Sequence, residues 1–273
     1  MEALNLQDIK PANIMKTIFY TLSLSLLAFA VSSCDNLWDS CIEGNGYRIT
    51  ETRDLNAFEQ LQINGEFDVD IDTGSTYSVM IQSDENLMDV IVTHVSGNRL
   101  IIESRNGTCL RPSSPIEMVV TVPELNNVTL NGSGSIYCFG MDVEELNVTL
   151  TGSGQISMLQ ITSTGMDLEL EGSGIINASG VAENVTADIE GSGEIRVTGN
   201  AVNADLKIIG SGRIKAGSLV SEVCYAYISG SGIIDCNVLN ALDVTIIGSG
   251  IVYYEGSPVV ESYVSGSGSV VQQ

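Results

Sequence analysis

The chain has 273 residues, and its 34 Asp and Glu against 11 Lys and Arg give it a formal net charge of −23. Such an acidic protein repels phosphate, so we expect no nucleic-acid partner and no direct adhesion to anionic lipid. Only one His is present and no Cys-x-x-Cys spacing occurs, which argues against His-based catalysis, a zinc site and any cofactor.

The N-terminal residues are typical of a lipoprotein export signal. Lys16 precedes an apolar run over residues 18–31, and Ser32 and Ser33 lead into Cys34. This Val-Ser-Ser-Cys stretch resembles a lipobox, in which the peptide is cut before a Cys that becomes lipidated. The sequence therefore predicts lipid attachment at Cys34.

The boundaries follow from that cleavage point. We expect residues 1–33 to be a signal peptide whose true start is Met15, and residues 34–46 to be a lipidated linker. The alternative is a membrane-spanning helix, but the run of about 14 apolar residues is shorter than the roughly 20 that a bilayer requires. Acyl chains on Cys34 would hold the protein on a membrane without crossing it.

Residues 47–125 are rich in the period-two alternation of apolar and polar residues that is typical of half-buried strands. The alternating apolar residues are Phe67, Val69, Ile71, Tyr77, Val79, Ile81, Leu100, Ile102, Met118, Val120 and Val122. This segment lacks the repeat that follows it. We expect it to be a strand-rich N-terminal cap or a set of irregular first coils, because the open end of a strand stack needs cover.

Residues 126–273 contain an internal repeat marked by Gly-Ser-Gly at spacings of 18 to 20 residues. The first glycines of the eight copies are Gly132, Gly152, Gly172, Gly191, Gly210, Gly230, Gly248 and Gly266. Apolar residues recur six, four and two positions before most copies, and again two positions after every copy, as at Ile136, Ile156 and Ile176. The pattern predicts strands on both sides of a tight corner that needs glycine.

The repeat length indicates the fold. Two or three short strands in each 18–20-residue repeat predict an all-β, parallel β-helix of about eight coils, stacked roughly 4.8 Å apart. Left-handed hexapeptide solenoids have coils of similar length, but their six-residue period is missing here, so we favour the right-handed form. A further hypothesis is a homo-oligomer in which a second subunit protects the last coil.

The remaining cysteines divide into two groups. Cys41 and Cys109 flank the segment before the repeats, and we predict that they form a disulfide. Cys138, Cys224 and Cys236 fall on apolar positions of the repeat, where a Cys is a small buried residue.

Several stretches together resemble one bacterial family. These are Cys-Ile-Glu-Gly-Asn-Gly over residues 41–46, Ile-Asn-Gly-Glu-Phe-Asp-Val within residues 58–74, residues 85–94, and the Gly-Ser-Gly series. The chain is similar over residues 41–270 to the family called putative auto-transporter adhesin, head GIN domain. The resemblance implies a right-handed β-helix, export to a Gram-negative envelope and a function in adhesion, and it supplies no catalytic residues.

Three outward surfaces are candidates for binding. Stacking would bring together the acidic residues Asp167, Glu169, Glu171, Asp188 and Glu190, which could bind calcium or could simply form a solvated face. The repeat serines could form a hydroxyl row for a polysaccharide, although serine is also an ordinary residue of tight turns. Tyr225, Tyr227 and Tyr263 lie on outward positions and form the best candidate ligand patch.

The sequence favours a non-enzyme. Four basic residues occur in the repeats, and no Gly-x-Ser-x-Gly or phosphate loop is present. We predict an outer membrane lipoprotein, on the periplasmic or cell-surface face, that presents a β-helical rod for adhesion or surface assembly with a polysaccharide or protein partner. The alternatives are a carbohydrate-binding or carbohydrate-cleaving β-helix protein and a structural envelope component.

Overall fold

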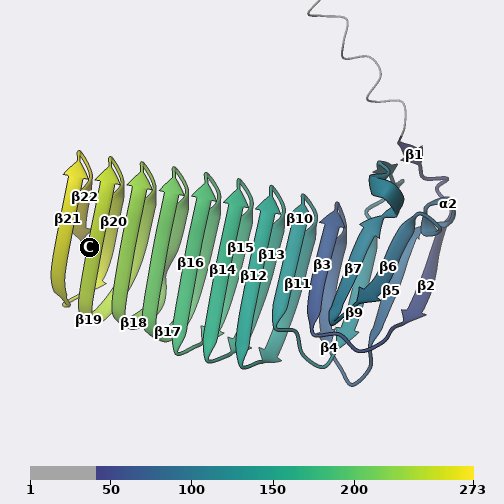
Figure 1. The fold of residues 1–273 in the computed structure, drawn as a ribbon, viewed down its shortest axis with the longest axis horizontal. Coiled ribbons are helices and arrows are strands. Elements are labelled where there is room, and N and C mark those ends of the chain that lie inside the picture. Colours follow the sequence, from purple (N-terminus) through teal and green to yellow (C-terminus); the bar gives the residue numbers. More distant parts are fainter. Residues whose placement is uncertain (1–40) are drawn as a thin grey trace, which may run out of the picture. The chain divides into compact units, whose positions relative to one another are not determined.

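Each repeat contributes two strands that meet at a Gly-Ser-Gly corner in the computed structural model, which describes residues 41–273. The repeat strands are β10 (Asn127–Gly132), β11 (Ser135–Asp142), β12 (Glu145–Gly152), β13 (Gln155–Thr162), β14 (Gly165–Gly172), β15 (Ile175–Val181), β16 (Asn184–Gly191), β17 (Glu194–Gly210), β18 (Arg213–Gly230), β19 (Ile233–Gly248), β20 (Ile251–Gly256), β21 (Val259–Gly266) and β22 (Ser269–Gln272). These strands stack in chain order, from β10 and β11 in teal to β22 in yellow (Figure 1). The expected parallel β-helix is confirmed, and its eight corners enclose seven full turns between Gly132 and Gly266.

The coils form two parallel sheets. The first sheet contains the strands that precede the corners: β10, β12, β14, β16, the later parts of β17, β18 and β19, and β21. The second sheet contains the strands that follow the corners: β11, β13, β15, the earlier parts of β17, β18 and β19, then β20 and β22. Every coil thus has two strands, and each sheet has one outward face.

The corners need glycine because successive coils approach closely there. Gly152 has φ +127°, and a Cβ at this position would lie 2.5 Å from the carbonyl oxygen of Gly132 in the preceding coil. The neighbouring Ser153 donates its backbone N–H to that same oxygen at 3.1 Å. The corner is therefore both a turn and a point of attachment between coils.

The core lies between the two sheets and consists of stacked rows of apolar side chains. One row in the second sheet contains Ile136, Ile156, Ile176, Ile195, Ile214, Ile234 and Val252, which are at most 1% exposed. The free cysteines Cys138, Cys224 and Cys236 are buried in the same core, as their repeat positions predicted. Alternation in the sequence thus determines which side chains fill the coil and which point outward.

The segment before the repeats contains strands and two short helices. Its elements are β1 (Ile42–Glu43), β2 (Arg48–Asp54), β3 (Gln60–Gly65), β4 (Asp68–Thr73), β5 (Ser78–Asp84), α2 (Glu85–Met88), β6 (Ile91–Ser96), β7 (Arg99–Ser104), the 3-10 helix η1 (Arg105–Gly107), β8 (Leu110–Arg111) and β9 (Glu117–Val122). Within residues 41–273, neither helix has the length and hydropathy of a membrane-spanning segment.

This segment supplies two irregular coils and an outer layer. Strand β3 pairs in parallel with β10 on one side and β7 on the other, and β4 pairs likewise with β11 and β9. The coil of β3 and β4 therefore lies between that of β7 and β9 and the repeats, although it comes earlier in the chain (Figure 1). Strands β6, β5 and β2 then add in antiparallel pairings at this end.

Candidate functional site

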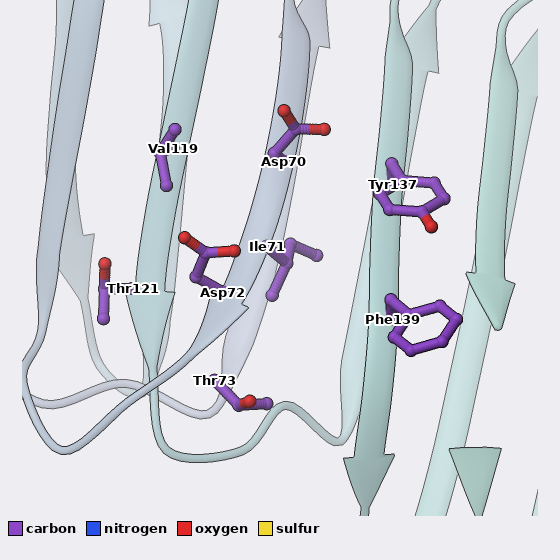
Figure 2. Close-up of a pocket in the computed structure, with 8 residues that line it drawn as sticks. All are labelled: Asp70, Ile71, Asp72, Thr73, Val119, Thr121, Tyr137 and Phe139. Atoms are coloured by element: carbon purple, nitrogen blue, oxygen red, sulfur yellow. The ribbon is translucent and has the colours of Figure 1, made fainter. Parts of the chain in front are cut away.

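A groove opens on the second sheet where β4 and β11 separate. The two strands pair from Asp68 opposite Ser135 to Ile71 opposite Cys138, and the pairing stops there. Beyond that point β4 follows β9, whereas β11 follows β13. The divergence leaves a surface cavity of about 530 Å³ between β4 and β11 (Figure 2).

The groove has an acidic wall and an aromatic wall. Asp70 and Asp72 project from β4, and Tyr137 and Phe139 project from β11 (Figure 2). Both aromatic rings are open to solvent, with 43% of Tyr137 and 53% of Phe139 exposed. Tyr137 is the direct neighbour of Asp70 in the strand pairing, so an aromatic ring and a carboxylate lie side by side.

The remaining lining comes from neighbouring strands. Val119 and Thr121 of β9 stand beside Asp70 and Asp72 in the next coil, and Thr73 and Ile71 complete the set. None of the eight lining residues is cationic. Asp70 and Asp72 give the groove a negative potential. Beneath it, burial and then the nearby charge of Asp72 raise the pKa of the Cys138 thiol to about 11. The groove therefore disfavours anions.

The predicted tyrosine patch lies on the opposite sheet from this groove. Tyr227 and Tyr263 belong to one outward row of the first sheet, with Thr245 between them, and Tyr225 lies in the adjacent row beside Asp243. Tyr225 is 52% exposed and Tyr263 is 64% exposed, whereas Tyr227 is half-buried. Tyr225 also lines a small hollow of about 190 Å³ together with Asp243 and Glu261. A ligand role for the three tyrosines stays a prediction.

The predicted acidic cluster occupies the same face, closer to the middle of the stack. Asp167, Glu169 and Glu171 of β14 stand beside the outward residues of β16, which include Asp188 and Glu190. The Lys207 ammonium contacts the Asp188 carboxylate from the following coil. Burial and the Asp188 charge raise the pKa of Asp167. Within residues 41–273, no group of three or more His, Cys, Asp or Glu side chains could hold a metal ion.

The predictions of lipid attachment and of a disulfide concern Cys34, Cys41 and Cys109. Cys34 falls outside the described residues, so its lipidation stays a prediction. Cys41 and Cys109 are each disulfide-bonded, and the backbone N–H of Ile42 donates to the Cys109 carbonyl at 2.9 Å. Their pairing with one another stays a prediction.

Sequence reasoning missed the groove because its two walls are 67 residues apart. The alternation of Asp68, Asp70 and Asp72 indicated a strand, but it did not indicate which other strand pairs with it. The available signal was the match between Ile-Asn-Gly over residues 63–65 and Leu-Asn-Gly over residues 130–132, which pair residue by residue. That match would have placed Asp70 beside Tyr137.

Comparison with known proteins supports this architecture. The family model described as putative auto-transporter adhesin, head GIN domain, matches residues 57–198 and 181–258. A crystal structure described as a putative lipid binding protein from Parabacteroides distasonis has 28% identity and a TM-score of 0.82, covering 85% of this chain and 99% of its own. A putative adhesin from Parabacteroides merdae has 22% identity and a TM-score of 0.81, covering 86% and 99%.

No curated protein matches the chain. The family model nevertheless spans most of the described residues, and it includes both walls of the groove. The chain therefore belongs to the family of putative auto-transporter adhesins, head GIN domain.

Proposed function

We propose that this protein is a non-catalytic adhesin of the bacterial cell envelope, which presents a rigid β-helical rod and binds a surface polymer through its outward side chains. The observation that carries the proposal is the groove between β4 and β11, an open recognition surface built on a closely packed stack. Packed parallel coils hold outward side chains at fixed spacing, which reduces the entropy lost when an extended polymer binds. Membership in an adhesin family supports the same function.

The arrangement of the groove carboxylates supports a binding role over a hydrolytic one. Glycosidases place two carboxyl groups on either side of the bond that breaks. Asp70 and Asp72 instead lie two residues apart on one strand and form the same wall (Figure 2). The opposite wall consists of Tyr137 and Phe139, which offer aromatic faces for contact.

We further propose that lipid enters this protein's function as a covalent anchor on Cys34. The relative described as a putative lipid binding protein raises the question of an internal lipid site. The inward side chains of the coils pack against one another with almost no exposure, so they already occupy the space that an acyl chain would need. An anchored rod suits a role at the cell surface.

Attachment assays test the adhesin proposal. Strains expressing the wild-type chain, or carrying a deletion of its gene, are compared for adhesion to immobilised polysaccharides, for envelope permeability and for polysaccharide breakdown. We expect deletion to reduce attachment while permeability and breakdown stay unchanged. Loss of envelope integrity would favour a structural component, and loss of depolymerised product would favour an enzyme.

The anchor is tested separately. Cys34→Ala should release the protein from the membrane fraction, and protease treatment of intact cells should degrade the wild-type chain if it faces outward. Mass measurement of the mature N-terminus reports acylation directly. An unmodified Cys34 would contradict the anchor without affecting the groove.

A further inference from the structure

We infer that the groove between β4 and β11 is a saccharide subsite, which binds one uncharged sugar ring of a polysaccharide. The inference rests on the proposed function and names the ligand class for it. It uses four side chains, namely Asp70, Asp72, Tyr137 and Phe139, all of which line the cavity (Figure 2).

The aromatic wall suits the apolar face of a pyranose. Tyr137 and Phe139 are alternate residues of β11, so both point to the outer side of the second sheet. They remain substantially exposed, although the residues between and beside them, Cys138 and Ile136, are buried. Exposed rings that stay fixed on a strand lose little entropy when they stack on a ligand.

The acidic wall suits the hydroxyl edge of the same ring. An ionised carboxylate only accepts hydrogen bonds, and sugar hydroxyls donate them. Asp70 and Asp72 face the groove, and neither forms an ion pair with any residue of the described range 41–273, in contrast to Asp188 and Lys207 on the other sheet. Their oxygens are therefore available to accept hydroxyl protons from a ligand.

The negative charge of the groove favours neutral carbohydrates over anionic ones. Two carboxylates and no cation among the lining residues repel uronic acids, sulfated sugars and phosphate groups. The cavity volume of about 530 Å³ is that of a small-ligand site, and its open side allows a longer chain to continue past it. A neutral polysaccharide fits these properties.

The test is titration calorimetry of the purified chain with maltohexaose, cellohexaose, xylohexaose and mannohexaose, beside oligogalacturonate and chitosan hexamer. We expect saturable binding of at least one neutral hexasaccharide and none of oligogalacturonate. Tyr137→Ala and Phe139→Ala should each weaken binding at least tenfold, and Asp70→Asn should weaken it roughly three- to tenfold.

Tyr47→Ala is the matched control, because Tyr47 is an exposed tyrosine, 65% accessible, that does not line the groove. It should bind like the wild type, and circular dichroism should show that all variants stay folded. Failure of every neutral hexasaccharide to bind would overturn the inference, as would unchanged binding by Tyr137→Ala or binding of chitosan hexamer alone.

The attachment assay separates this inference from the adhesin proposal. If Tyr137→Ala cells attach as well as wild-type cells, the groove is not the adhesive site, although adhesion stands. If the purified chain binds a neutral hexasaccharide but its gene does not affect attachment, the subsite stands and the adhesin proposal fails.

Discussion

Asp84 connects three segments of the N-terminal region through one buried carboxylate. Its side chain is fully buried at the end of β5. One oxygen accepts the backbone N–H of Gly46 at 2.8 Å and the hydroxyl of Ser113 at 2.6 Å, and the other accepts the backbone N–H of Ser113 at 2.8 Å. The Ser113 hydroxyl is the main reason that the pKa of Asp84 lies below its ordinary value, in spite of burial.

We predict that Asp84→Asn destabilises the protein by about 1 to 3 kcal/mol at pH 7, because an amide nitrogen would face backbone donors that need an acceptor. A depressed pKa in the folded state gives stability that is present above the unfolded pKa of about 4 and disappears as the pH falls through the lower folded value. Urea unfolding at pH 7 and at pH 2 measures both effects.

The difference between wild type and Asp84→Asn should therefore shrink at the lower pH. Asp54→Asn is the control, because Asp54 is exposed on the neighbouring strand β2 and should change stability by less than about 0.5 kcal/mol. An equally large difference at both pH values would contradict the electrostatic account.

At the scale of the element, the two corners of each coil differ in how far they tolerate changes in repeat length. At the Gly-Ser-Gly corner the glycines pair in unbroken register, for example Gly152 with Gly172 and Gly172 with Gly191. The strands after that corner contain the register shifts, as between Met158 and Ile161. Repeats of unequal length therefore stack because the glycine corner stays aligned and the opposite corner absorbs the difference.

Gly172→Ala should consequently be costly. Gly172 has φ +121°, and a Cβ there would lie 2.5 Å from the carbonyl oxygen of Gly152. We expect a loss of about 2 to 4 kcal/mol in the free energy of unfolding. In Gly217→Ala the nearest atom to the new Cβ is 4.0 Å away, so this control should stay within about 1 kcal/mol of the wild type. Similar losses of stability in both variants would show that the close approach at the Gly-Ser-Gly corner does not require glycine.

At the scale of the whole molecule, the sequence predicted the repeats better than the segment before them. Alternation and Gly-Ser-Gly predicted the inward rows because each row draws one residue from every coil, as at Ile156 and Ile176. The coil of β3 and β4 was harder to predict, since Glu66 and Phe67 replace Ser and Gly after Gly65. Its position between β7 and β10 depends on pairings between distant segments, which local patterns do not contain.

A stack of nearly equivalent coils should tolerate the loss of one whole coil. Deleting residues 173–191 removes β15 and β16 and joins Gly172 to Ser192, which restores a Gly-Ser-Gly corner. We expect a folded, shorter rod whose unfolding midpoint falls by roughly 5 °C, since each coil contacts mainly its neighbours.

Deleting residues 175–183 is the contrasting variant. It removes β15 alone and connects two strands of the first sheet without a return strand. This protein should fail to unfold cooperatively in a thermal melt followed by circular dichroism. Cooperative melting of both variants, or of neither, would contradict the claim that one whole coil is the unit that can be removed without loss of folding.

The alignment of the glycine corners also affects how such a gene can change. Because Gly172 and Gly191 are equivalent points in successive coils, recombination between the codons of two corners adds or removes an entire coil and preserves both the reading frame and the inward rows. Recombination between corners from Gly152 onward can therefore change the length of the rod in steps of one coil, and it leaves Asp70 and Tyr137 in place.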